Sequence, residues 1–157
     1  MSLATITTYQ AYLSIHILAA VVWVGGALTM QLFAIRATRS GDNQHLVAVT
    51  KDIEWIGTRF FIPSSLILVV FGFLMINEGD LDYEFWLVFP IVIWALSFLS
   101  GAAFLGPESG RVSKAFDAQG ADSAEGQARL KRVFLVSRIE LVFLILVVLD
   151  MALKPFS

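Results

Sequence analysis

Residues 9–35 read YQAYLSIHILAAVVWVGGALTMQLFAI and contain no lysine, arginine, aspartate or glutamate. A helix needs about 20 apolar residues to cross a hydrocarbon layer of about 30 Å, so this stretch is long enough to span a membrane. Residues 1–8 carry no basic residue, and the apolar stretch exceeds the ~7–15 residues usual in a secretory signal. We therefore expect an uncleaved membrane span.

Three further apolar stretches lie at about residues 60–76, 85–105 and 133–153. Each is continuously apolar rather than alternating, which indicates helices and not the strands of a membrane barrel. The sequence therefore predicts an all-α, four-helix transmembrane bundle with up-down-up-down topology. Residues 1–157 would form this single integral membrane domain.

The composition supports a membrane protein and excludes several other classes. Hydrophobic residues make up 57% of the 157 residues and charged residues 15%, against about 45–50% and about 25% in soluble domains. A net charge of −2 gives no reason to expect nucleic acid. The chain has no cysteine, which excludes disulfides, thiolate zinc sites and iron–sulfur clusters. The predicted partner is the lipid bilayer, and a homo-oligomer or a membrane partner subunit stays open.

Basic residues gather in two of the three loops between the predicted spans. They are Arg36, Arg39, Lys51, Arg59, Arg111, Lys114, Arg129, Lys131 and Arg132. The middle loop, residues 77–84, has no basic residue. By the positive-inside rule, both basic loops face the cytoplasm of a bacterial inner membrane, and both termini are extracytoplasmic.

The two basic loops also carry signals of local structure. Leu46, Val49, Ile53 and Ile56 recur at helical spacing, which predicts a short amphipathic cytoplasmic helix before span two. Residues 106–110, GPESG, are typical of a helix end after span three.

Polar groups within spans usually face the bundle interior, and His16 is the first of them. On a helix it shares a face with Ala20, Trp23 and Ala27, and the small residues leave room for a flat group. A b-type haem held by His16 as axial ligand would use that space, with Ala20, Trp23 and Ala27 beside it. The alternative is that the alanines allow a neighbouring helix to approach and His16 hydrogen-bonds across the contact.

A second group of candidate ligands lies near the extracytoplasmic ends of spans two and four. Met75 and Met151, together with His16 and the carboxylate of Asp150, suit Cu(I) or a haem with histidine and methionine ligands. The alternative is that the methionines only pack, and that Asp150 pairs with Lys154 four residues later.

Span four contains two more charged residues, Arg138 and Glu140. Arg138 is close enough to the cytoplasmic side to extend its guanidinium to the surface. Glu140 either pairs with Arg59 or belongs to a proton or ion path. No set of residues supports hydrolytic chemistry, so the sequence predicts no catalytic residue and leaves enzymatic activity open.

Three motifs together resemble an uncharacterised family of predicted four-span bacterial integral membrane proteins. They are HILAAVVWVGGA at residues 16–27, FIP at 61–63 followed by GFLM at 72–75, and DMALKP at 150–155. The resemblance covers nearly the whole chain and implies a four-span fold without an assigned activity.

The histidine, tryptophan and glycine pattern in the first span is also similar to two better-understood groups. These are the copper-resistance D-type membrane proteins and the small membrane protoporphyrinogen oxidase, in which the corresponding histidine is associated with haem. Only His16 and Trp23 carry over, and residues 85–105 lack the lysine that the oxidase uses in its third span. The expected function is binding of haem b, or of copper, in electron transfer or haem handling. The alternatives are a non-catalytic structural or accessory subunit and a small copper or ion transporter.

Overall fold

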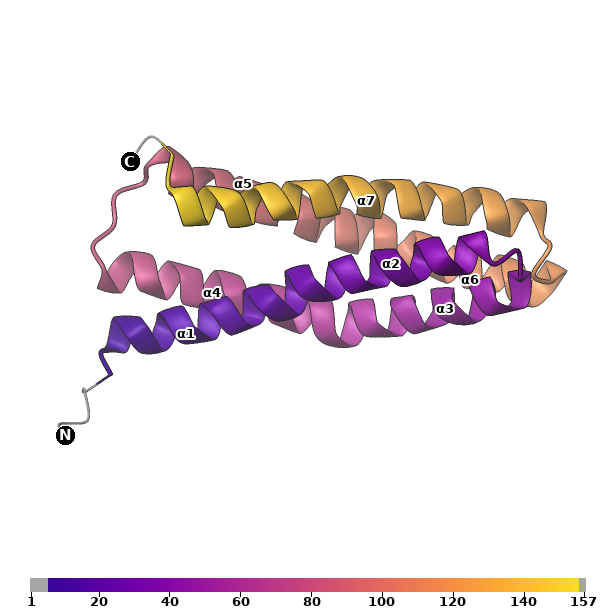
Figure 1. Cartoon of the computed structure of the whole chain (residues 1–157), viewed down its shortest axis with the longest axis horizontal. Coiled ribbons are helices and arrows are strands. Elements are labelled where there is room, and N and C mark those ends of the chain that lie inside the picture. The colour runs from indigo at the N-terminus through magenta and orange to yellow at the C-terminus, as the bar shows by residue number, and fades with distance from the viewer. Residues whose placement is uncertain (1–5, 156–157) are drawn as a thin grey trace.

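The structure, a computed structural model, describes residues 6–155, which form four long antiparallel helices (Figure 1). In chain order, their segments are α1 (Thr8–Ala20), η1 (Val21–Gly25) and α2 (Gly26–Arg39); α3 (Asn43–Ile56), η2 (Gly57–Phe61) and α4 (Ile62–Glu78); α5 (Phe85–Ser100), η3 (Gly101–Leu105) and α6 (Gly106–Gln119); and α7 (Ala124–Leu153). Each η segment is a single π-helical turn within a continuous helix. The described residues contain no strand, so the all-helical prediction is confirmed.

Three of the four helices are long and apolar enough to cross a membrane. They comprise Thr8–Arg39, Asn43–Glu78 and Phe85–Gln119. The fourth, α7, has 30 residues and carries Arg138, Glu140 and Asp150 within its apolar part. The structure thus contains three helices that can span a membrane and a C-terminal helix packed against them.

One predicted helix end is wrong, and the predicted amphipathic segment is part of a longer helix. The segment predicted as a short amphipathic helix before span two is α3, and it joins α4 without a break in a helix of 36 residues. The predicted helix end at residues 106–110 is instead the first turn of α6. At about 1.5 Å per residue, the 36-residue helix is roughly 54 Å long, far more than a hydrocarbon core of about 30 Å.

Two of the π-turns explain how proline is tolerated in these long helices. Pro63 and Pro107 are the second residues after η2 and η3 and lie in the first turn of the next α-helical segment. Within an α-helix, proline lacks an N–H and its ring clashes with the carbonyl four residues earlier. In both cases that earlier residue, Arg59 or Ala103, lies in the wider π-turn.

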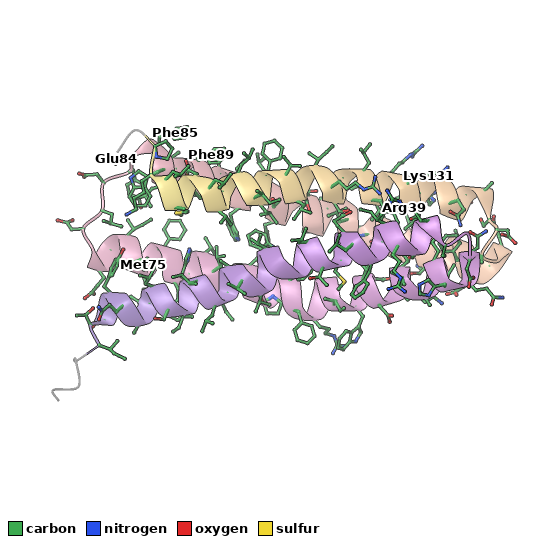
Figure 2. All side chains as sticks on the ribbon, in the orientation of Figure 1. Arg39, Met75, Glu84, Phe85, Phe89 and Lys131 are labelled. Atoms are coloured by element: carbon green, nitrogen blue, oxygen red, sulfur yellow. The ribbon has the colours of Figure 1, made fainter. Side chains whose placement is uncertain are left out.

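The two ends of the bundle differ in charge and in packing. Arg39 and Lys131 lie toward the end that holds the α2–α3 and α6–α7 connections, whereas Met75 and Glu84 lie at the other end (Figure 2). We call these the basic end and the acidic end. A core of buried side chains lies at the basic end, where α2, α3, α6 and α7 meet. Its members are Ala34, Ala37, Leu46, Val112, Phe116, Leu130, Val133 and Phe134.

Toward the acidic end, the helices associate mainly as two pairs. α1 packs along α4, and α5 packs along α7 (Figure 1). The Trp94 indole of α5 donates a hydrogen bond to the Ser65 carbonyl of α4 at 3.1 Å, which connects the pairs. Most large apolar side chains on the outside of the pairs are exposed, as expected where lipid is the solvent.

Candidate functional site

His16 lies in the contact between α1 and α4. Its Nδ1 is 2.8 Å from the Leu68 carbonyl oxygen, so the imidazole donates this hydrogen bond from Nδ1. A carbonyl partner fixes the tautomer and leaves the lone pair on Nε2. No described residue hydrogen-bonds Nε2, and the ring is only half-buried. The structure therefore presents an oriented imidazole with one unused nitrogen.

Small residues allow α1 and α4 to approach closely around this histidine. Gly72 lies against the imidazole, since a Cβ at this position would be 3.2 Å from His16 Cε1. Near the middle of the bundle, a Cβ on Gly26 would be only 2.5 Å from Phe61 Cε1. At the acidic end, Tyr12 and Phe71 pack edge to face at 5.7 Å. Close packing at small residues is how helices associate in a bilayer.

The other residues predicted to surround a cofactor are divided between two places. Trp23 and Ala27 line a cavity of about 230 Å³ inside the bundle, whereas His16 and Ala20 are not part of its lining. Met75 follows Gly72 by about one turn on α4, and is therefore on the same helix pair as His16. Met151 is on α7, in the other pair. Within residues 6–155, no group of three or more His, Asp or Glu side chains could hold a metal ion.

The charged residues of α7 occupy three different environments. Arg138 is exposed and forms no ion pair with a described residue. Asp150 is buried near the acidic end, and its Oδ2 has no hydrogen-bond partner among the described residues. The expected ion pair with Lys154 is absent, because the Lys154 ammonium lies 4.6 Å from the centre of the Trp86 ring.

Glu140 lines the cavity rather than pairing with Arg59. The Ser100 hydroxyl of α5 interacts with its carboxyl group, and Oε1 has no hydrogen-bond partner among the described residues. On the facing helix α2, the Gln31 amide nitrogen donates a hydrogen bond to Ser137 Oγ at 2.5 Å. The Gln31 Oε1 is also buried without a described partner.

Sequence reasoning missed Gln31, Ser100 and Ser137 as parts of this polar cluster. Gln31 was detectable, because it is an amide side chain within the apolar stretch 9–35. The two serines carried no such signal, since serine is common at helix contacts in membranes.

A charged network outside the apolar segments holds the basic end together. Glu108 is buried and accepts hydrogen bonds from Arg129 at 2.7 Å and Arg111 at 3.0 Å. Arg129 also pairs with Glu125 at 3.0 Å. Hydrogen bonds from Arg129, and then from Arg111, lower the pKa of the Glu108 carboxyl below its usual value. These contacts connect α6 to α7 and have no geometry that suggests catalysis.

Comparison with known proteins places the chain in a family. Residues 11–155 match the model of a family described as predicted integral membrane protein (DUF2269). No curated protein and no solved structure shows significant similarity to the chain. The resemblance to copper-resistance D-type proteins and to the oxidase therefore stays a prediction. The family match covers nearly the whole sequence and fits the three long apolar helices, and the chain thus belongs to this family of predicted integral membrane proteins.

Proposed function

We propose that this chain is a bacterial inner-membrane protein that binds haem b through His16, in electron transfer or haem handling. The observation that carries the proposal is the hydrogen bond from His16 Nδ1 to the Leu68 carbonyl at 2.8 Å. Histidines that ligate a metal usually donate their other ring N–H to a carbonyl or carboxylate, which orients the ring and raises its basicity. Nε2 of His16 would then hold the haem iron.

The proposal includes a four-span topology with the basic end in the cytoplasm. α7 would be the fourth span, because it runs the length of the bundle and its residues 141–149 are uninterrupted apolar side chains. The basic residues of both connections at one end would then follow the positive-inside rule. The polar halves α3 and α6 would project from the membrane into the cytoplasm.

The residues would supply one ligand rather than a complete set. His16 supplies the imidazole, and Met75 is the thioether on the adjoining part of α4. Met151 belongs to the other helix pair, so a copper site that needs all three residues requires the pairs to approach each other. Haem, when bound, would supply the redox chemistry, and this chain would orient the imidazole and surround it with apolar side chains.

The test is the absorption spectrum of the protein purified in mild detergent from cells supplied with ample haem. A Soret band is expected in the wild-type protein and in His45→Ala, the matched control, because His45 is exposed on α3. The band should be lost in His16→Ala.

Three other outcomes have definite meanings for the function. A colourless wild-type protein would refute haem binding. Bound copper that is lost in both His16→Ala and Met75→Leu would replace haem by copper. If neither cofactor binds and His16→Ala changes only the melting temperature, His16 is a packing residue of a structural or accessory subunit.

A further inference from the structure

Residues of all three π-turns line the cavity inside the bundle. Trp23 of η1, Phe61 of η2 and Gly101 of η3 all line its volume of about 230 Å³. A π-turn inserts an extra residue into a helix, and such turns are frequent at functional sites. Proline accounts for η2 and η3, but no proline follows η1. Three helices thus depart from regular α-geometry around one space, which is separate from His16.

The side chains around the cavity favour a cation. Glu140 and Glu54 contribute carboxylates, and Gln31 contributes an amide. None of the described residues that line it is lysine, arginine or histidine. Aromatic rings, including Trp23 and Phe61, form part of the wall, and such rings attract cations through their electron-rich faces.

Two oxygen atoms in the cavity wall lack a partner that donates a hydrogen bond. Gln31 is 7% exposed, and its amide nitrogen is engaged by Ser137, but its Oε1 is unpaired. Glu140 Oε1 is unpaired one turn along α7 from Ser137. A buried acceptor without a donor is energetically unfavourable. A ligand that donates N–H or O–H groups to both oxygens would remove this cost.

The size of the cavity favours an organic ion over a bare metal ion. A water molecule takes up about 30 Å³ in the liquid, so about 230 Å³ is several times the space of one small inorganic ion with a water. We propose that this cavity binds a small organic ammonium ion. Its N–H groups donate to Glu140 Oε1 and Gln31 Oε1, and its hydrocarbon part lies against the aromatic rings.

The cavity reaches from the apolar part of the bundle into its polar part. The lining extends from Leu144 and Ser97, within the apolar part of the bundle, to Glu54 and Ser109 in its polar part. The Glu54 Oε2 accepts a hydrogen bond from Ser113 at 2.8 Å, which holds this carboxylate at the polar side of the cavity. Glu54 thus adds a second carboxylate at the polar side of the cavity, and Glu140 binds the cation in its apolar part.

The experiment measures binding of benzylamine to the purified full-length protein, by titration calorimetry and by the shift in melting temperature. Benzyl alcohol is the uncharged probe of nearly the same shape. Benzylamine should bind saturably and raise the melting temperature, whereas benzyl alcohol should bind at least tenfold more weakly. Glu140→Gln should weaken benzylamine binding at least tenfold, and Asp150→Asn should leave it unchanged, because Asp150 is a buried carboxylate of the same helix outside the cavity.

A second variant keeps the test independent of the folding of Glu140→Gln. No heavy atom lies within 4 Å of a Cβ built on Gly101, so Gly101→Leu places its side chain in open space and should block the cavity. The proposal is overturned if benzylamine shows no saturable binding to the wild-type protein, or if Gly101→Leu binds it as well as the wild type does. Equal stabilisation by Na⁺ alone, lost in Glu140→Gln, would overturn the organic ligand in favour of an ion site.

Discussion

Adjacent glycines in the first long helix should respond oppositely to the same substitution. A Cβ on Gly25 would meet no heavy atom within 4 Å, whereas a Cβ on Gly26 would be 2.5 Å from Phe61 Cε1 and 3.1 Å from Cζ. Both residues have right-handed helical backbone angles, so alanine fits the backbone at either position. The two variants therefore share the change in helix propensity and differ only in what the methyl group meets.

The magnitude follows from these distances. Non-bonded carbons prefer about 3.5–4.0 Å, so the Phe61 ring must move by roughly 1 Å to accommodate alanine at position 26. Overpacking of this kind costs about 1–3 kcal/mol, and replacing a helical glycine by alanine gains up to ~1 kcal/mol. Gly25→Ala should therefore be more stable than the wild type. Gly26→Ala should be less stable than Gly25→Ala by about 1–3 kcal/mol, the cost of overpacking.

The assay is unfolding in mixed micelles at increasing denaturing detergent, followed by tryptophan fluorescence. Phe61→Leu shortens the opposing side chain, so the penalty of Gly26→Ala should shrink in the double variant. Equal effects of Gly25→Ala and Gly26→Ala, or a penalty that Phe61→Leu leaves unchanged, would refute the close approach of the first and second long helices at Gly26 and Phe61.

Three further predictions concern the basic end and the topology. Because the pKa of Glu108 is lowered on folding, mainly by Arg129, its stabilising contribution is present at neutral pH. That contribution should decline as the pH falls below about 4.5, the usual glutamate value, and Glu108→Gln should flatten this part of the stability curve measured by thermal unfolding. Phe116→Ala should cost about 3–5 kcal/mol in the same assay, because Phe116 is 4% exposed in a packed core; a loss below ~1 kcal/mol would contradict that packing. In this cysteine-free chain, a membrane-impermeant maleimide should label Asp82→Cys from outside intact cells and Lys114→Cys only after lysis; the reverse would invert the topology.

The sequence could predict which stretches are apolar but not where the helices end. Composition and length identified residues 9–35, 60–76 and 85–105, and all three lie within longer helices of the structure. The polar extension α6 was missed because glycine and proline in residues 106–110 normally end a helix. A π-turn directly before α6 accommodates Pro107, and a π-turn has no residue pattern that would have predicted it here.

The candidate sites were predictable in part for a similar reason. A lone histidine or glutamate in an apolar stretch is conspicuous, so the sequence alone singles out His16 and Glu140 as candidates. Their partners were not, because the Leu68 carbonyl carries no side-chain signal and the pairing of Gln31 with Ser137 joins residues 106 positions apart. Spacing along one helix likewise placed Trp23 beside His16, whereas Trp23 lines the cavity and His16 contacts α4.

The core at the basic end means that this protein has two kinds of stability in one bundle. Val112, Leu130 and their neighbours are buried among polar helical segments, where expulsion of water stabilises packing and urea weakens it. Between α1 and α4 the surrounding solvent is as apolar as the side chains, so shape and hydrogen bonding have to hold the pair. The order in which the two ends lose their packing should therefore differ between heating, cooling and chemical denaturation. The end that keeps the four helices together is the one most sensitive to aqueous conditions.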